Sequence, residues 1–219
     1  MLAAIKAIIQ KHSPHPDRVT ILGACKAQPL EKIRHAVGEG LTILGNNYVQ
    51  EGAAVREALP EFKGEWHFIG HIQSRKVRDL IVYDCVQSLD RLKLATALHD
   101  RALAQNKIVN VLIEINLGNE VTKSGIAPQE LPEFLRQLRT LKQLKIRGLM
   151  GMPPPSETAE LRRPHFKQLR ALFDSEGRGA WTTLSMGTSE DYPVALEEGA
   201  TLIRLGSVLF GARPPKENK

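Results

Sequence analysis

The stretch T-I-L-G-A-C-K at residues 20–26 is a short apolar run that ends on a lysine. Alternation along a strand divides its side chains between two faces, with Leu22, Ala24 and Lys26 on one and Ile21, Gly23 and Cys25 on the other. Both faces are largely apolar, which is typical of a strand buried on both sides in an α/β sheet. The pattern predicts that Lys26 lies at the C-terminal end of a buried strand and points into the middle of the fold.

A lysine in that position has two interpretations. Desolvation disfavours the charged ammonium, and a neutral amine is a nucleophile that forms a Schiff base with an aldehyde. A lysine at a strand end can also simply reach back to water, as most lysines do. The rest of the chain decides between the two.

Strand-like and helix-like stretches alternate over the whole chain. After an opening helix expected at 2–12, the strand-like runs occupy 20–26, 41–47, 66–71, 85–89, 109–117, 146–152, 182–186 and 202–210. The helical stretches occupy 29–40, 48–59, 74–83, 90–106, 128–141, 157–173 and 190–198. Eight strands close a (β/α)8 TIM barrel, and no G-x-G-x-x-G follows the first strand, so the barrel is favoured over an open doubly wound sheet.

Length and composition are those of an ordinary globular protein. The 219 residues contain no linker-like or low-complexity stretch, so we expect one domain over residues 1–219. No apolar run approaches the roughly 18 residues that cross a bilayer, and residues 2–10 do not read as a signal peptide, so we expect a cytoplasmic protein without a membrane segment. The two cysteines, Cys25 and Cys85, lie in strand-like runs and are expected to be buried free thiols.

The net charge of +6 raises the question of nucleic-acid binding. Most basic residues are mixed with acidic ones along the predicted helices. The densest cluster, Arg75, Lys76 and Arg78, has no aromatic residues beside it on which bases could stack. We therefore expect a solvated surface and no nucleic-acid partner. An RNA- or protein-interaction module at Arg75–Arg78 is the alternative, and salt-dependent RNA binding would support it.

The ends of the last two strands predict a phosphate site. In (β/α)8 barrels, sites form at the C-terminal ends of the strands, and phosphate commonly binds the loops after strands seven and eight. Here the sequence reads S-M-G-T-S-E-D at 185–191 and R-L-G-S at 204–207, which supplies glycines, hydroxyls and backbone N–H groups. Thr188 or Ser189 is the expected N-cap of the next helix. Plain caps and turns are the alternative interpretation.

Arg204 and Lys26 are expected to share a cavity, because strand eight lies beside strand one when a barrel closes. A buried arginine needs an acceptor, either a carboxylate of the core or a heteroatom of a ligand. A lysine amine, a phosphate cup and an arginine match the aldehyde, phosphate and pyridine nitrogen of pyridoxal 5′-phosphate (PLP). Further polar residues at strand ends fit the rim of this cavity: Asn46, Asn47, His67, His71, Glu114, Asn116 and Lys123.

No metal site is expected. His67 and His71 share a predicted strand face, but Cys85 is the only other obvious candidate nearby, and no known ligand spacing emerges. P-loop, H-E-x-x-H and G-x-S-x-G motifs are also missing from the sequence.

Eight motifs occur in order between residues 19 and 213. They are A-C-K at 24–26, G-N-N-Y-V-Q-E at 45–51, W-H-F-I-G at 66–70, Q-S-R-K at 73–76, K-S-G at 123–125, R-G-L-M at 147–150, S-M-G-T-S-E-D at 185–191 and R-L-G-S-V-L-F-G-A-R at 204–213. With them the chain closely resembles the pyridoxal phosphate homeostasis proteins, small PLP-binding barrels similar to the N-terminal domain of alanine racemase. It departs from the usual family pattern at Cys25, Asn46 and His71; Cys25 should face the helices, and the other two lie at the expected rim.

The resemblance implies a role for each residue of the site. Lys26 would carry PLP as the internal aldimine, and Arg204 would face the pyridine nitrogen. The phosphate would be held by Ser185, Gly187, Thr188, Gly206 and Ser207. Asn47 and Met150 would line the ring, and Lys123 would lie on the aldimine side.

The resemblance also implies the function, which is PLP binding in intracellular vitamin B6 homeostasis without robust turnover. A cationic arginine disfavours a protonated pyridine and so weakens the ring as an electron sink. Racemases of this type also use a tyrosine from a separate C-terminal domain, which we do not expect here. PLP-requiring apoenzymes are possible recipients, and we expect a monomer. The alternative is a PLP-dependent racemase or lyase of the same fold that uses Lys123 or His67 as an accessory base.

Overall fold

The predicted barrel is present in the structure. The computed structural model describes residues 1–118 and 124–212. Within them eight parallel strands pair in chain order, and β8 pairs with β1, so the sheet closes on itself. The strands are β1 (Thr20–Ala24), β2 (Ile43–Asn46), β3 (Glu65–Phe68), β4 (Cys85–Leu89), β5 (Val109–Ile115), β6 (Leu144–Gly151), β7 (Thr183–Thr188) and β8 (Leu202–Leu205). The (β/α)8 fold class is therefore confirmed.

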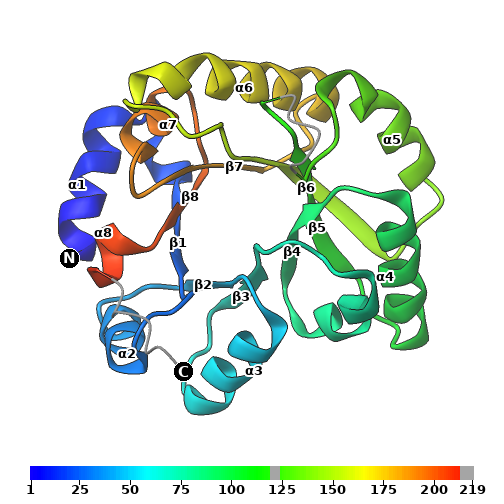
Figure 1. The fold of residues 1–219 in the computed structure, drawn as a ribbon, viewed down its shortest axis with the longest axis horizontal. Coiled ribbons are helices and arrows are strands. Elements are labelled where there is room, and N and C mark those ends of the chain that lie inside the picture. The colour runs from blue at the N-terminus through cyan, green and yellow to red at the C-terminus, as the bar shows by residue number, and fades with distance from the viewer. Residues whose placement is uncertain (119–123, 213–219) are drawn as a thin grey trace.

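Helices form an outer ring around these strands (Figure 1). The α-helices of the described residues are α1 (Leu2–His12), α2 (Leu30–Gly38), α3 (Val49–Ala58), α4 (Leu92–Ala104), α5 (Leu131–Leu138), α6 (Arg163–Gly177), α7 (Tyr192–Glu197) and α8 (Ser207–Phe210). Short 3-10 helices are η1 (Pro16–Arg18), η2 (Ser74–Val82), η3 (Pro128–Glu130) and η4 (Glu160–Arg162). None of the helices in these residues is both long and apolar enough to cross a bilayer.

The structure specifies one predicted helix more closely and shortens one predicted strand. The helix predicted at 74–83 is present as η2, a 3-10 helix whose three-residue turn places Val77 and Leu80 on one buried face. The strand expected at 202–210 ends at Leu205, and α8 follows. An apolar run does not distinguish a buried strand from a buried helix, and Gly206 turns the chain between the two.

The apolar core lies mostly outside the barrel, between strands and helices. This outer layer includes Cys25, Leu44 and Phe166, each fully buried, and burial of one such large side chain stabilises a fold by about 1.5–3 kcal/mol. Cys25 faces the helices, as expected, and both cysteines are buried free thiols. Inside the barrel the apolar clusters are small: Leu22, Ile43 and Leu202 form one, and Cys85, Leu112 and Met150 form another. The interior therefore has room for polar side chains.

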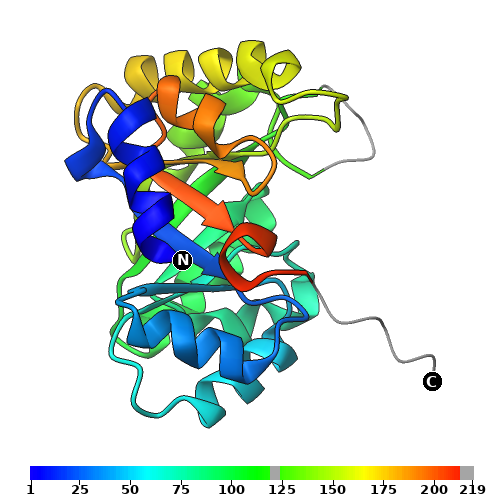
Figure 2. The same ribbon diagram turned by 90° about the vertical axis from the view of Figure 1, so that its left-hand side faces the viewer.

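The strands give the barrel a direction. Viewed from the side, the arrows of β1 and β8 point toward α8 (Figure 2). Leu22 of β1 is in register with Arg204 of β8, so the first and last strands deliver their C-terminal ends to the same place. The loops that were expected to carry the site all leave from this end.

Candidate functional site

A cavity of about 310 Å³ opens at the C-terminal ends of the strands. Seven of the nine residues predicted to bind PLP line it: Lys26, Asn47, Met150, Thr188, Arg204, Gly206 and Ser207. They follow or belong to β1, β2, β6, β7 and β8, so barrel closure brings together segments from both ends of the chain. Ala24, Ile69, Glu114, Met152, Ser189 and Glu190 complete the wall.

Lys26 lies two residues beyond β1 rather than within it. The N–H of Cys25 still donates to the carbonyl of Gly45 at 2.9 Å, so pairing with β2 extends to the residue before the lysine. The side chain is only partly buried, and Nζ lies 5.2 Å from the centroid of the Tyr48 ring. It also borders a second cavity of about 290 Å³, lined in part by Tyr48 and Lys76. Lys26 thus occupies the wall between two cavities.

Arg204 is buried beside this cavity and is held by neutral acceptors. Nη1 donates to the carbonyl of Ser185 at 2.9 Å and to its Oγ at 2.7 Å, and Nη2 donates to the carbonyl of Gly151 at 3.1 Å. Burial lowers the pKa of the guanidinium to about 10, so it remains a cation at neutral pH. Within the described residues, no carboxylate forms an ion pair with it. A core carboxylate therefore does not account for this arginine.

Glu114 of β5 is a carboxyl group in the same wall. Burial is the main cause that raises its pKa to about 7, and the charge of Asp90 acts in the same direction. The positive charges of Arg204 and Arg91 oppose the shift. Glu114 therefore changes protonation near neutral pH, directly beside the cavity.

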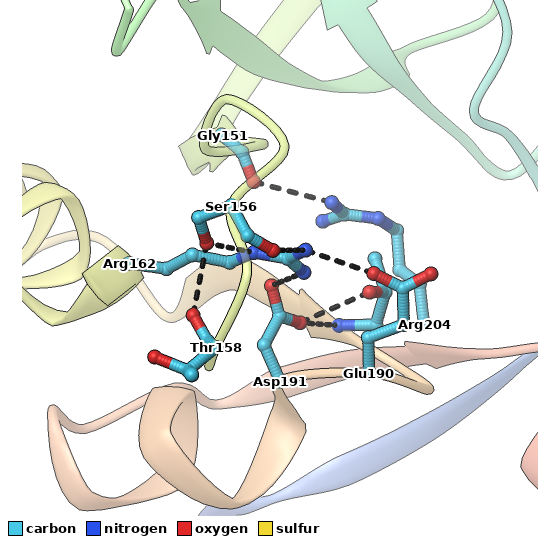
Figure 3. A network of polar contacts seen from close by, with 8 residues as sticks. Gly151, Ser156, Thr158, Arg162, Glu190, Asp191 and Arg204 are labelled. Carbon is cyan, nitrogen blue, oxygen red and sulfur yellow. Dashed lines mark hydrogen bonds and ion pairs between the residues drawn. The ribbon is translucent and has the colours of Figure 1, made fainter. Parts of the chain in front are cut away.

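The loop after β7 is fixed by a buried ion pair (Figure 3). Asp191 Oδ1 accepts hydrogen bonds from the N–H of Thr188 at 2.6 Å and from its Oγ1 at 3.0 Å. Arg162 donates from Nη1 to Asp191 Oδ2 at 2.8 Å and from Nη2 to Glu190 Oε2 at 2.9 Å. The N-cap of α7 is Asp191, not Thr188 or Ser189 as predicted, because the helix begins at Tyr192. Nothing in the sequence indicated Arg162.

The loop after β8 presents backbone N–H groups to the loop after β7. The N–H groups of Gly206 and Val208 donate to Oγ of Ser189 at 3.1 and 3.3 Å. A Cβ built on Gly206 would meet no atom closer than 3.9 Å, so it would project into free space. The glycine therefore leaves this part of the cavity free of a side chain, while Ser189 accepts from both N–H groups.

Two residues that the resemblance implied for phosphate do not border this cavity. Ser185 is fully buried in the barrel, where its hydroxyl lies between Arg204 and Gln87. Gly187 is buried and has φ +90°, and a Cβ there would lie 2.7 Å from Cβ of Ala195. Its position therefore supports a structural role, which is the close turn from β7 into α7.

His67 lies at the opposite end of the barrel from where it was expected. It lines a cavity of about 240 Å³ together with Thr20, Thr183 and Leu202, which begin or nearly begin their strands. His67 does not border either cavity that Lys26 lines. An accessory base acting beside Lys26 cannot come from this histidine. The other accessory candidate, Lys123, lies outside the described residues.

The remaining rim residues are divided between different surroundings. Asn46 is fully buried, and its side chain lies against Gly52 of α3 rather than at the rim. His71 lines the 290 Å³ cavity and contacts Oγ of Ser124 at 2.7 Å. Across residues 1–118 and 124–212, no group of three or more His, Cys, Asp or Glu side chains is arranged to hold a metal ion.

Comparison with known proteins identifies the group to which this barrel belongs. The family described as "Alanine racemase, N-terminal domain" matches residues 2–214. Alanine racemase of Clostridium difficile has the same fold, with a TM-score of 0.73 at 16% identity over 96% of this chain and 56% of that one. Fold and cavity together define a barrel of the alanine racemase N-terminal type.

More similar proteins narrow this class. A pyridoxal phosphate homeostasis protein of Aquifex aeolicus is 44% identical over 88% of this chain and 86% of its own length. One from Escherichia coli K12 is 36% identical over 95% and 92%. PipY of Synechococcus elongatus, solved without PLP and with PLP bound, is 33% identical with TM-scores of 0.86 and 0.85 and is covered completely. The chain belongs to the family of pyridoxal phosphate homeostasis proteins, as its motifs indicated.

Proposed function

We propose that the protein binds PLP in the 310 Å³ cavity, attached to the amine of Lys26, and serves PLP homeostasis without robust catalytic turnover. The observation that carries the proposal is the composition of this one cavity. It combines a lysine amine, a buried arginine without an ion pair among the described residues, and N–H and hydroxyl groups from the loops after β7 and β8. The names of the relatives and the PLP-bound PipY structure support it.

These groups fit the three polar parts of PLP. PLP would supply an aldehyde, and the amine of Lys26 would hold it by taking the place of the aldehyde oxygen, which would leave as water. We assign Arg204 to the pyridine nitrogen, because its guanidinium borders the cavity and is held on the other side by neutral carbonyls. We assign Thr188, Gly206 and Ser207, which line the same cavity, to the phosphate. We assign Asn47 and Met150 to the ring.

The same groups argue for binding rather than rapid chemistry. A guanidinium that stays protonated donates a hydrogen bond to the pyridine nitrogen and disfavours a proton there. An unprotonated pyridine is a weaker electron sink, so proton removal from a bound amino acid gains little. We propose that the protein stores and delivers PLP to apoenzymes.

The raised pKa of Glu114 in the wall of the cavity favours the alternative function, a PLP-dependent racemase or lyase. A carboxyl group with a pKa of about 7 in the wall of the cavity has the properties of a general acid or base at neutral pH. Amino-acid turnover by the PLP-loaded protein, well above the background of free PLP and lost in Glu114→Gln, would establish this alternative.

The proposal is tested first by spectroscopy and labelling. PLP is added to the protein, the visible spectrum is recorded, the link is reduced with borohydride, and the modified peptide is mapped by mass spectrometry. We expect a new absorption band and a stable adduct on Lys26, both lost in Lys26→Ala. Lys76→Ala is the matched control, since Lys76 lines only the neighbouring cavity. A Lys26→Ala protein that behaves like the parent would refute the attachment.

The wider setting is also part of the proposal. We propose that residues 1–219 form a single domain that acts as a monomer in the cytoplasm. The continuous barrel over most of the chain supports the single domain. Limited proteolysis and light scattering of the purified protein test the domain and the monomer, and cell fractionation tests the location. Salt-dependent RNA binding would instead favour an interaction module at Arg75–Arg78.

A further inference from the structure

A row of buried polar side chains crosses the barrel interior from Arg204 to the opposite end. Arg204 Nη1 lies 2.7 Å from Ser185 Oγ, and that hydroxyl lies 2.6 Å from Gln87 Oε1. Gln87 Nε2 lies 2.9 Å from His67 Nδ1, and His67 Nε2 lies 2.8 Å from Glu65 Oε2. Four different strands contribute these five residues, and four of the five are at most 6% exposed.

Hydrogen-bond capacity gives this row a direction. A guanidinium only donates, so Ser185 Oγ accepts from Arg204 and gives its own proton to the Gln87 carbonyl oxygen. The Gln87 amide nitrogen then donates to Nδ1 of His67, which must be unprotonated to accept. The proton of a neutral His67 is therefore on Nε2, where it donates to the Glu65 carboxylate. In this arrangement every member donates to the next one.

The far end of the row is open to solvent. Glu65 has a side chain that is 62% exposed at the 240 Å³ cavity. The charged or titratable groups around His67 are Glu65, Cys85 and Arg147, which line this cavity, and Asp84, which precedes β4. Burial raises the pKa of Cys85 to about 12, so it stays neutral, and the hydrogen bond from His67 lowers the pKa of Glu65. Protons thus have access to His67 from the end opposite Lys26.

We propose that Gln87 is a positioning residue that transmits the protonation state of His67 to Arg204, so that the affinity for PLP is controlled from the N-terminal end of the barrel. This inference rests on the proposed function. A second proton on His67 places an N–H donor against the Gln87 NH₂ group. The amide then rotates, and Ser185 loses the acceptor of its hydroxyl proton. Arg204 must then share Ser185 Oγ with a second donor, so one of the three hydrogen bonds that orient its guanidinium is weakened, while those to the carbonyls of Ser185 and Gly151 remain.

The first test uses the protein without PLP. Nitrogen-15 NMR of labelled histidine reports which ring nitrogen carries the proton. At pH 8 we expect Nδ1 of His67 to be an unprotonated acceptor and Nε2 to carry the proton. A proton on Nδ1 at this pH would overturn the direction of the row and with it the proposal.

The second test measures the PLP affinity of each variant and of the parent at the same pH. PLP itself titrates, and its contribution cancels in the ratio of the two affinities. The loss of one ordering hydrogen bond, about 1 kcal/mol, corresponds to a roughly fivefold weaker affinity. We expect that loss in Gln87→Met at pH 8. In Glu65→Gln, which changes an exposed side chain, we expect parental affinity at pH 8. Between pH 8 and pH 5.5 the affinity should fall less than in the parent, because the carboxylate that pairs with a doubly protonated His67 is removed.

Asn110→Ser is the matched control, because Asn110 lines the same N-terminal cavity but is not part of the row. It should follow the parent at both pH values. Parental affinity and parental pH dependence in both Gln87→Met and Glu65→Gln would overturn the coupling while leaving PLP binding intact. If neither the parent nor any variant binds PLP, the proposed function is refuted instead. The NMR result still decides in which direction the hydrogen bonds of the row are donated.

Discussion

Two buried arginines near the cavity have opposite surroundings. Arg162 is 9% exposed and is paired with two carboxylates, those of Asp191 and Glu190. Arg204 is 6% exposed and contacts the backbone carbonyl and the hydroxyl of Ser185. It also contacts the carbonyl of Gly151, which Figure 3 shows. The hydrogen bond that Arg162 donates to Asp191 raises the pKa of Arg162, whereas burial lowers the pKa of Arg204. The charge of Arg162 is neutralised by carboxylates, whereas Arg204 forms no ion pair with the residues that the structure describes.

The two arginines differ in whether the described residues supply a carboxylate for each charge. A buried ion pair contributes mainly by holding its two partners in one geometry, here the loop that carries Thr188. A buried cation without a countercharge is costly to the fold, and such groups concentrate at functional sites. The two arginines should therefore respond differently when each is removed.

The largest effect is expected for Arg162→Met. It leaves the carboxylate of Asp191, which is 2% exposed, without its countercharge, and loss of one partner of a buried pair costs about 3–5 kcal/mol. Urea unfolding measures this free energy. Arg136→Met is the matched control, because the Arg136–Glu133 pair is exposed to solvent and contributes little to stability. Equal costs for the two variants would remove the distinction between buried and exposed pairs here.

A smaller effect, with a defined pH dependence, is expected for Glu114→Gln. The folded-state pKa of Glu114 is raised to about 7, so the folded protein binds this proton more tightly than the unfolded chain. Stability therefore falls as the pH rises from about 4.5 to 7, and the full penalty of about 3 kcal/mol is present above that window.

Glu114→Gln removes this penalty, because an amide does not ionise. The variant should be more stable than the parent at pH 8 and indistinguishable from it at pH 4, as measured by urea unfolding at both values. A gain in stability at pH 4, or none at pH 8, would show that Glu114 stays ionised in the folded protein.

The smallest effect on stability is expected for Arg204→Met. Removal of the guanidinium leaves the carbonyls of Ser185 and Gly151 without a donor, at about 1–3 kcal/mol, but it also removes a desolvated charge. We expect a net cost below about 2 kcal/mol in urea unfolding. PLP affinity should fall at least tenfold in an absorbance titration, since a charged hydrogen bond is lost. The reverse result, a large loss of stability with unchanged PLP affinity, would make Arg204 a structural residue like Arg162.

Local sequence was a good guide to the elements and to the place of the cavity. Each of the eight strand-like runs contains one of the eight strands. Such runs can be predicted because hydrophobic periodicity and the signals that start and stop helices depend on residues that are close in the chain. It was a poor guide to where a strand stops, since Leu209 and Phe210 are as apolar as the strand before them but belong to α8. Local sequence also did not predict the hydrogen-bond partners of individual side chains. Gln87 and Ser185 are 98 positions apart and meet only when the barrel has closed.

By itself, the sequence determined the closed barrel, the family, and the lysine and two loops at one end of the strands, because strand period, loop composition and motif order are all local. Only the tertiary structure decided that Arg162 neutralises Asp191, that Ser185 turns inward to Arg204 and Gln87, and that His67 lies at the far end from Lys26. The physical reason is that a buried polar group must find its partner within hydrogen-bond distance. In a barrel, that distance is set by strands that are neighbours in space and far apart in the chain.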